Sequence, residues 1–171
     1  MLTSYTYEEL TLGRSASLVR TVTLDDIRAF AAISGDLNPT HLEPDFAAQT
    51  PFREPIAHGM FAASLISAVL GTRLPGPGTI YLNQSLSFRK PVFAGDTLEA
   101  TVSVLGHNPV KRWVRLDCRV TNQKGELVLS GEAEVIPPAQ HGQYPEPALP
   151  VLRVQDSGKV AGTDLRFSVR S

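Results

Sequence analysis

Two short segments of the sequence hold the side chains best suited to chemistry: residues 34–41 (SGDLNPTH) and residues 56–60 (IAHGM). The first segment places a carboxylate, Asp36, five residues before an imidazole, His41, and Pro39 keeps the residue before it extended. An Asp–His pair can share one water molecule, because one group can orient the water while the other moves a proton. A structural alternative stays open, since Asp36 could cap the turn and His41 could bond to backbone.

Gly59, in the second segment, opens a predicted helix. Because glycine has no side chain, a ligand oxygen can approach its backbone N–H at the positive end of the helix dipole. Such an amide could hold a carbonyl oxygen that gains negative charge, although close packing at the start of a helix would explain the glycine equally well. His58 is interpreted as structural, with a ring nitrogen that ties the loop down.

Other chemistries have weaker support from the residues. Ser64 and Ser67 lie outside any Gly-x-Ser-x-Gly elbow and are expected to bond to backbone carbonyls. Cys118, the one cysteine in the chain, alternates with apolar residues and is predicted to be a core residue that forms neither an intrachain disulfide nor a zinc cluster. Arg89 and Lys90 are interpreted as solvated charges rather than phosphate ligands.

Three predicted helices would position these side chains. A helix is expected between Thr23, whose side chain can cap the first turn, and Gly35, which ends it. A short helix is expected at residues 44–48, and the segment before it, residues 36–41, is predicted to be an ordered loop. The third helix, residues 59–70, is apolar or small at almost every position, which predicts that other structure covers it on most sides.

From Thr79 onward, apolar and polar residues alternate, which predicts antiparallel strands with one face on the core. A curved sheet wrapped around the buried helix, an α+β arrangement, satisfies both patterns. The residues predicted to face the core are Ile80, Leu82, Leu86, Phe88, Leu98, Ala100, Val102, Val104, Val114, Leu116, Cys118, Val120, Leu127, Leu129, Ala133 and Val135.

Composition limits the class of protein further. The chain has 171 residues, with 16 Lys and Arg against 17 Asp and Glu, and holds no polybasic run, which disfavours nucleic acid as a partner. No apolar run is long enough to cross a bilayer, and the first residues lack the pattern of a secretory signal. Together with the single cysteine, these features predict a cytoplasmic protein that does not bind membranes.

The sequence is expected to divide into a domain over residues 1–136 and a proline-rich linker or C-terminal arm over residues 137–171. Five of the 13 prolines lie between Pro137 and Pro150. Weak strand character at residues 151–154 and 165–169 would allow the end of the chain to pack on the domain, reach a partner or begin a further segment.

Three longer segments together resemble the MaoC-like (R)-specific enoyl-CoA hydratases: SGDLNPTHLEPDFA, FREPIAHGM and LPGPGTIYLNQSLSFRKPVFAGDTLEATVSV. They follow one another in order within residues 10–136, most of the chain. The whole is also similar to the N-terminal hydratase-like domain of bifunctional enoyl-CoA hydratase/phosphate acetyltransferase proteins, and that likeness would make the proline-rich tail a linker.

The resemblance implies a hot-dog fold, usually paired into a homodimer or a higher even oligomer. It implies reversible hydration of a trans-2-enoyl-CoA, the acyl-CoA thioester substrate, to a (3R)-3-hydroxyacyl-CoA, without a cofactor or a metal. Asp36 and His41 match the family's catalytic residues, and Gly59 matches the glycine whose amide holds the thioester oxygen. The residues expected to bind substrate are Ser67, which matches a serine associated with the active site, Asn38 and Met60.

Two other functions fit some of the same residues. A hot-dog thioesterase would use the same helix N-terminus to polarise the thioester but would aim its water at C1 rather than at Cβ. A non-catalytic acyl-CoA-binding domain would need neither Asp36 nor His41, so the presence of both favours an enzyme.

Overall fold

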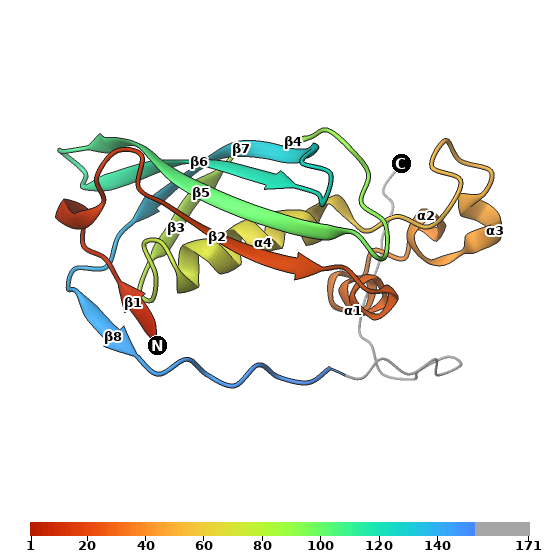
Figure 1. Cartoon of the computed structure of the whole chain (residues 1–171), viewed down its shortest axis with the longest axis horizontal. Coiled ribbons are helices and arrows are strands. Elements are labelled where there is room, and N and C mark those ends of the chain that lie inside the picture. The colour runs from red at the N-terminus through yellow and green to blue at the C-terminus, as the bar shows by residue number, and fades with distance from the viewer. Residues whose placement is uncertain (153–171) are drawn as a thin grey trace, which may run out of the picture.

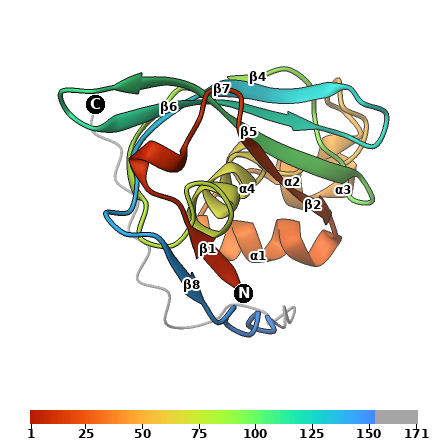
Figure 2. The same cartoon turned by 60° about the vertical axis from the view of Figure 1, so that its left-hand side comes forward.

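Helix α4 (Gly59–Thr72) lies against the concave side of a six-stranded antiparallel sheet in the computed structural model, which describes residues 1–152 (Figure 1). Figure 2 shows the sheet on one side of α4 and helix α1 (Leu24–Ser34) on another. The predicted α+β arrangement is confirmed. In pairing order the strands are β2 (Ser15–Thr21), β5 (Thr97–Asn108), β6 (Trp113–Thr121), β7 (Leu127–Ile136) and β3 (Ile80–Gln84), with β4 (Ser87–Phe88) also paired to β7.

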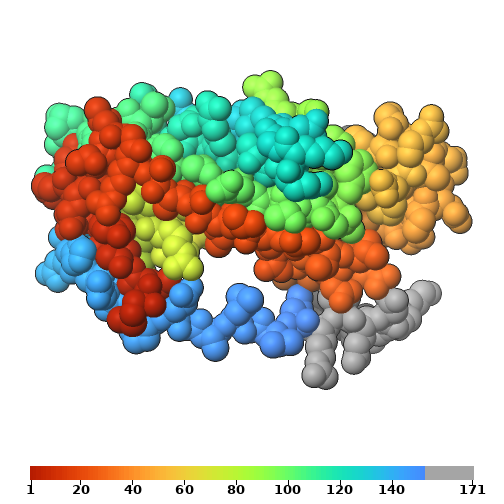
Figure 3. Space-filling view, viewed as in Figure 1, coloured from red at the N-terminus to blue at the C-terminus, as the bar shows by residue number. Residues whose placement is uncertain are grey.

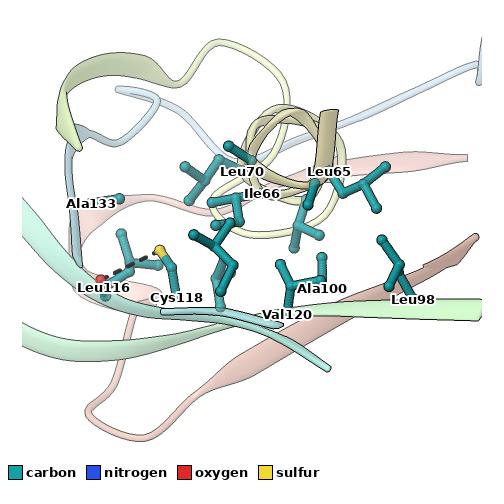
Figure 4. Packing of buried hydrophobic residues seen from close by; sticks show 14 of the residues in the cluster. Leu65, Ile66, Leu70, Leu98, Ala100, Leu116, Cys118, Val120 and Ala133 are labelled. Carbon is teal, nitrogen blue, oxygen red and sulfur yellow. Dashed lines mark hydrogen bonds between the residues drawn. The ribbon is translucent and has the colours of Figure 1, made fainter. Parts of the chain in front are cut away.

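The core lies between α4 and the inner face of β5 and β6 (Figure 4). On these two strands the predicted inward residues are confirmed, because all eight are buried. The register places Ala100 opposite Val120 and Val102 opposite Cys118, so apolar side chains pair across the strands under Ile66 of the helix. Each fully buried Val, Leu or Ile contributes about 1.5–3 kcal/mol to folding.

The prediction for residues 80–88 is wrong in part. Ile80, Leu82 and Phe88 are 55%, 39% and 53% exposed, and of the four predicted residues Leu86 packs against the core. The pairing of β3 with β7 is irregular between Tyr81 and Asn83, which breaks the alternation within β3, and β3 lies at the edge of the sheet.

A second irregularity changes the inner face of β7. The pairing of β6 with β7 shifts between Val120 and Thr121, and as a result the neighbours Val128 and Leu129 are both buried while Leu127 is only partly covered. The core position predicted for Leu127 is therefore taken by Val128.

One face of α4 is open, which corrects the expectation that the whole helix is buried. Met60 is 55% exposed, and Ser64, Ser67 and Gly71 are also exposed. These residues recur every three or four positions and so form one stripe along the helix. The space-filling view in Figure 3 shows part of α4, in yellow, through the opening between β2 and the chain that follows β8 (Gly142–Tyr144).

Helix α1 begins and ends as predicted. The Thr23 hydroxyl accepts a hydrogen bond from the Asp26 N–H at 3.1 Å, and the Asp26 carboxylate accepts one from the Thr23 N–H at 2.9 Å, which completes a capping box. Gly35 ends the helix with a φ of 75°, in the left-handed region that favours glycine.

The segment predicted to be a loop is helical in its second half. Helix α2 (Pro39–Leu42) begins at a proline, whose missing N–H costs nothing at that position. The Asn38 side-chain oxygen accepts a hydrogen bond from the Thr40 N–H at 3.1 Å and caps the helix. His41 therefore projects from a helical turn. The short helix predicted to follow is α3 (Pro44–Ala47).

Several elements at the two ends of the described chain were not predicted. Strand β1 (Leu2–Ser4) is followed by the short helix η1 (Tyr7–Glu9) and pairs with β8, which belongs to the proline-rich segment. An ion pair between Arg73 and Glu146, at 3.0 Å, gives that segment another contact. The strand expected at residues 165–169, and half of the one at 151–154, lie outside the described residues.

No helix within residues 1–152 has the length and apolar content that a membrane span requires.

Candidate active site

Asp36 projects from the segment between α1 and α2, and its neighbours hold it in place. Its N–H donates to the Ser34 hydroxyl oxygen at 3.2 Å, and its Oδ1 accepts from the Asn38 N–H at 3.2 Å. The second carboxylate oxygen, Oδ2, points toward His41 and lies 3.9 Å from Nε2 of that ring. The carboxylate thus caps the turn with Oδ1, while Oδ2 faces His41.

His41 is oriented by a backbone carbonyl. Its Nδ1 lies 2.8 Å from the main-chain oxygen of Ile56, and since a carbonyl only accepts, Nδ1 carries the proton. In the neutral ring Nε2 then has the free lone pair, which is the form that a general base needs. The backbone bond that the structural alternative anticipated is therefore the contact that aims Nε2 at Asp36.

The 3.9 Å between Asp36 Oδ2 and His41 Nε2 exceeds a direct hydrogen bond. A water molecule bound to both groups would bridge such a spacing. The His41 side chain is 12% exposed and that of Asp36 is 53% exposed, so the pair faces solvent from the carboxylate side.

His58 joins the two segments of the site. It is 3% exposed, and its Nε2 lies 2.9 Å from the main-chain oxygen of Asp36, 22 residues earlier in the chain. Its ring stacks on that of His41 with centroids 3.8 Å apart. The interpretation that His58 ties the loop down is confirmed.

Gly59 follows directly and is the first residue of α4. The first N–H groups of a helix have no acceptor within it, and within residues 1–152 no hydrogen bond from the Gly59 N–H to another group is found. A Cβ at this position would lie 2.7 Å from Cε1 of Phe88. The glycine therefore leaves an amide free and also makes room for an aromatic ring, so both explanations of it remain compatible with the structure.

Two cavities flank the first turns of α4. The first, of about 290 Å³, is lined by Gly59 and Phe88, with the exposed Arg89 and Lys90 also in its wall. Lys90 forms an ion pair with Glu126 on the surface. The cavity thus combines an apolar wall, a free helix amide and positive charge.

The second cavity, of about 450 Å³, lies along the open stripe of α4. Met60 and Ser67, two of the three residues predicted to bind substrate, line it together with Ser64, whose hydroxyl donates to the Phe61 carbonyl at 2.6 Å. Asn38, the third, lines neither cavity, because its side chain caps α2. In the structure this side chain supports the loop, and its predicted contact with substrate stays a prediction.

Two aromatic residues at the site were not predicted. Phe30 lines the second cavity and contacts His58, with centroids 5.1 Å apart, and Tyr81 lines the same cavity. Burial raises the pKa of Tyr81 to about 12, so its hydroxyl stays protonated and donates to the Gln84 side-chain oxygen. The signal that could have found them is their place in the chain, since Tyr81 belongs to the third segment of the resemblance and Phe30 lies just before the first.

Asp36, His41 and His58 each offer one potential metal-ligand atom, and these three atoms lie within 4.8 Å of one another. The backbone bonds described above already use Nδ1 of His41 and Nε2 of His58. Nδ1 of His58 has no hydrogen-bond partner among the described residues, and Asp36 Oδ2 and His41 Nε2 face each other across 3.9 Å, a spacing that can hold a small ligand.

Cys118 takes no part in this site. It is fully buried on β6, and burial raises the pKa of its thiol to about 11, so it stays protonated at neutral pH. Its assignment to the core is confirmed.

A sheet wrapped around a central helix is the hot-dog fold, and in this chain an Asp–His pair lies close to the N-terminus of that helix. Residues 11–124 match the family described as MaoC like domain. The chain belongs to the MaoC-like family.

Curated relatives and solved structures agree with this assignment. An (R)-specific enoyl-CoA hydratase from Rhodospirillum rubrum is 52% identical over 136 residues, which are 78% of this chain and 92% of the relative. A 3-hydroxybutyryl-CoA dehydratase from Methylorubrum extorquens is 47% identical over 81% of this chain and 88% of its own. The unliganded R-hydratase PhaJ1 from Pseudomonas aeruginosa is 44% identical and superimposes with a TM-score of 0.84 over 90% of this chain and 99% of its own.

Proposed function

We propose that this chain hydrates trans-2-enoyl-CoA to (3R)-3-hydroxyacyl-CoA by means of a water held between Asp36 and His41 and a thioester oxygen held at the Gly59 amide. The chain is an enzyme of the hydratase class, as its close relatives indicate. The observation that carries the mechanism is the 3.9 Å spacing of Asp36 Oδ2 and His41 Nε2, with the imidazole lone pair directed between them.

In the proposed reaction, Nε2 of His41 takes a proton from the water as the water oxygen bonds to Cβ. The electrons of the double bond move toward the thioester, and the Gly59 N–H stabilises the negative charge on its oxygen. The enolate is then protonated at Cα by the pair, which restores its charge state and completes the addition of one water molecule. Asp36 orients the water and supports the imidazolium that forms.

The two cavities supply places for the remainder of the substrate. The apolar wall along Met60 and Ser67 suits an acyl chain. Arg89 and Lys90, interpreted from the sequence as solvated charges, are exposed but lie in the wall beside Gly59, and we propose that they offer positive charge to the phosphates of coenzyme A.

One assay separates this function from a thioesterase and from a non-catalytic acyl-CoA-binding domain. With crotonyl-CoA we expect the absorbance of the conjugated double bond to fall while no free thiol appears. Release of thiol would indicate a thioesterase, and binding without either change would indicate a non-catalytic domain.

The activity is expected to need no metal ion, because the proposed steps use only a carboxylate, an imidazole and a backbone amide. Dialysis against EDTA should leave kcat unchanged, and added Zn²⁺ should not raise it. Activity that disappears with the chelator and returns with a divalent ion would contradict the mechanism.

We also propose that the chain forms a homodimer or a higher even oligomer in the cytoplasm. Strand β3 is an edge of the sheet, Ile80 on it is 55% exposed, and the open stripe of α4 adds uncovered surface. Light scattering should give at least twice the monomer mass.

Substitution of Ile80 by Glu tests whether this edge is the contact surface. Since Ile80 is already exposed within one chain, the variant should fold, with a melting temperature near that of the wild type, but its mass should shift toward the monomer. Val110→Glu, at an exposed apolar position between β5 and β6, is the matched control. A wild-type protein that stays monomeric at every concentration would contradict the proposal.

A further inference from the structure

His58 contacts both members of the Asp–His pair, and we infer that it is a positioning residue for the hydration. The inference rests on the proposed roles of Asp36 and His41. Its side chain is 3% exposed and lines neither of the two cavities beside α4, so it acts through its neighbours rather than on the substrate.

The first contact fixes the main chain from which the carboxylate projects. Nε2 of His58 lies 2.9 Å from the carbonyl oxygen of Asp36, and because that oxygen can only accept, Nε2 carries the proton. This bond connects the segment after α1 to the residue before α4. The position of the Asp36 carboxylate relative to the start of α4 therefore depends on it.

The second contact fixes the plane of the base. The rings of His41 and His58 stack with centroids 3.8 Å apart and planes 29° apart. The bond from Nδ1 of His41 to the Ile56 oxygen holds one edge of the ring, and the stack holds its face. These two restraints fix the orientation of the His41 ring, so that Nε2 points toward Asp36.

Other aromatic rings support His58 in turn. Phe30 lies at a centroid distance of 5.1 Å from it, and Phe61 meets Phe30 edge-on at 6.0 Å. His58 is thus held between α1, α2 and the start of α4, which makes it a rigid support.

Stability alone does not explain a histidine at this position. Its Nδ1 is buried and has no hydrogen-bond partner among the described residues, and an unsatisfied buried acceptor lowers stability. The unsatisfied Nδ1 lowers the stability of the fold, yet the same ring uses Nε2 to bond to Asp36 and its face to stack on His41. The contacts that compensate for the cost are those made to Asp36 and His41.

Three substitutions separate the two contacts. His58→Gln keeps an N–H donor for the Asp36 carbonyl but loses the ring, His58→Phe keeps the ring but loses the donor, and His58→Ala loses both. Since a misplacement of about 1 Å can cost roughly 10²-fold in rate, we expect kcat of His58→Ala to fall by about that factor. The other two variants should each recover part of the loss, and KM should change little in all three.

His107→Ala is the matched control, because it also removes a histidine ring that contacts another aromatic residue, here Tyr7 at 5.0 Å. His107 lies on β5, and the His107→Ala variant should keep the kcat of the wild type. The melting temperature of every variant should be measured as well. If His58→Ala does not fold, the Gln and Phe variants carry the test.

The deciding measurement is His58→Phe in the presence of His41→Ala. If His58 acts through the Asp–His pair, the His58→Phe substitution should lower kcat little further once His41 is absent. The inference is overturned if every folded His58 variant keeps wild-type kcat while His41→Ala loses activity, or if the cost of His58→Phe is the same in both backgrounds. Wild-type turnover of His41→Ala itself would instead overturn the proposed mechanism, and the inference with it.

Discussion

Replacement of Asp36 by Asn or of His41 by Ala is expected to lower kcat by about 10²–10⁴, the usual cost of removing a positioned acid or base. Asp36→Asn keeps the shape of the side chain and its ability to accept from the Asn38 N–H, but it removes the charge that orients the water. His41→Ala removes the lone pair on Nε2. Because the two groups are proposed to share one water, the double variant should lose little more than the worse single variant.

The fall in crotonyl-CoA absorbance measures kcat, and the temperature of thermal unfolding serves as the control for stability. Asp36→Asn is expected to unfold near the wild-type temperature, since the Asp36 side chain is exposed. His41→Ala should stay folded but unfold at a lower temperature, because it loses the bond to the Ile56 oxygen and the stack on His58. Near-wild-type turnover in either one would rule out the dyad. A large loss of stability in Asp36→Asn would show instead that the carboxylate serves mainly to cap the turn.

Substitution of Gly59 by Ala is expected to lower kcat by about 10²-fold or more, the effect typical of losing one donor to a developing oxyanion. The added Cβ stands beside the free N–H and, at 2.7 Å from the Phe88 ring, also forces that ring to move. The backbone of Gly59 is not in the left-handed region, so alanine is not strained there, and its higher helix propensity offsets part of the clash.

Phe88→Ala separates the two explanations of this glycine. The ring of Phe88 is the group that the new methyl meets, so Gly59→Ala combined with Phe88→Ala should recover a melting temperature close to that of Phe88→Ala alone. Its kcat should stay low, because the methyl still blocks the amide. Recovery of kcat to the level of Phe88→Ala would mean that Gly59 is needed only for packing.

Local patterns in the sequence were sufficient to predict the elements whose apolar residues recur at a regular helix or strand spacing. The capping residues of α1, the start of α4 and the inner faces of β5 and β6 follow from side chains that lie within a few positions of one another. The same holds for the candidate site residues, because Asp36, His41 and Gly59 belong to two short segments of unusual composition.

Elements that depend on a distant partner could not be read in this way. Strand β2 is exposed except for the partly buried Ala16 and Leu18, an alternation too short to identify a strand, so its identity comes from pairing with β5. Strands β1 and β8 lie at opposite ends of the described chain and stabilise each other. The irregular pairings of β3 and β7 shift side chains between faces, and a bulge of one residue leaves no local signal strong enough to predict it.

The sequence by itself determined which residues can do the chemistry, since side-chain type, capping and period are local properties. The tertiary structure decided their geometry: the 3.9 Å between Asp36 and His41, the bond from His58 across 22 residues to Asp36, and the ring of Phe88 against Gly59. These distances depend on how α1, α2, α4 and β4 pack around one core. Packing of that kind sums many weak contacts between residues far apart in the chain, and no short segment of sequence contains them.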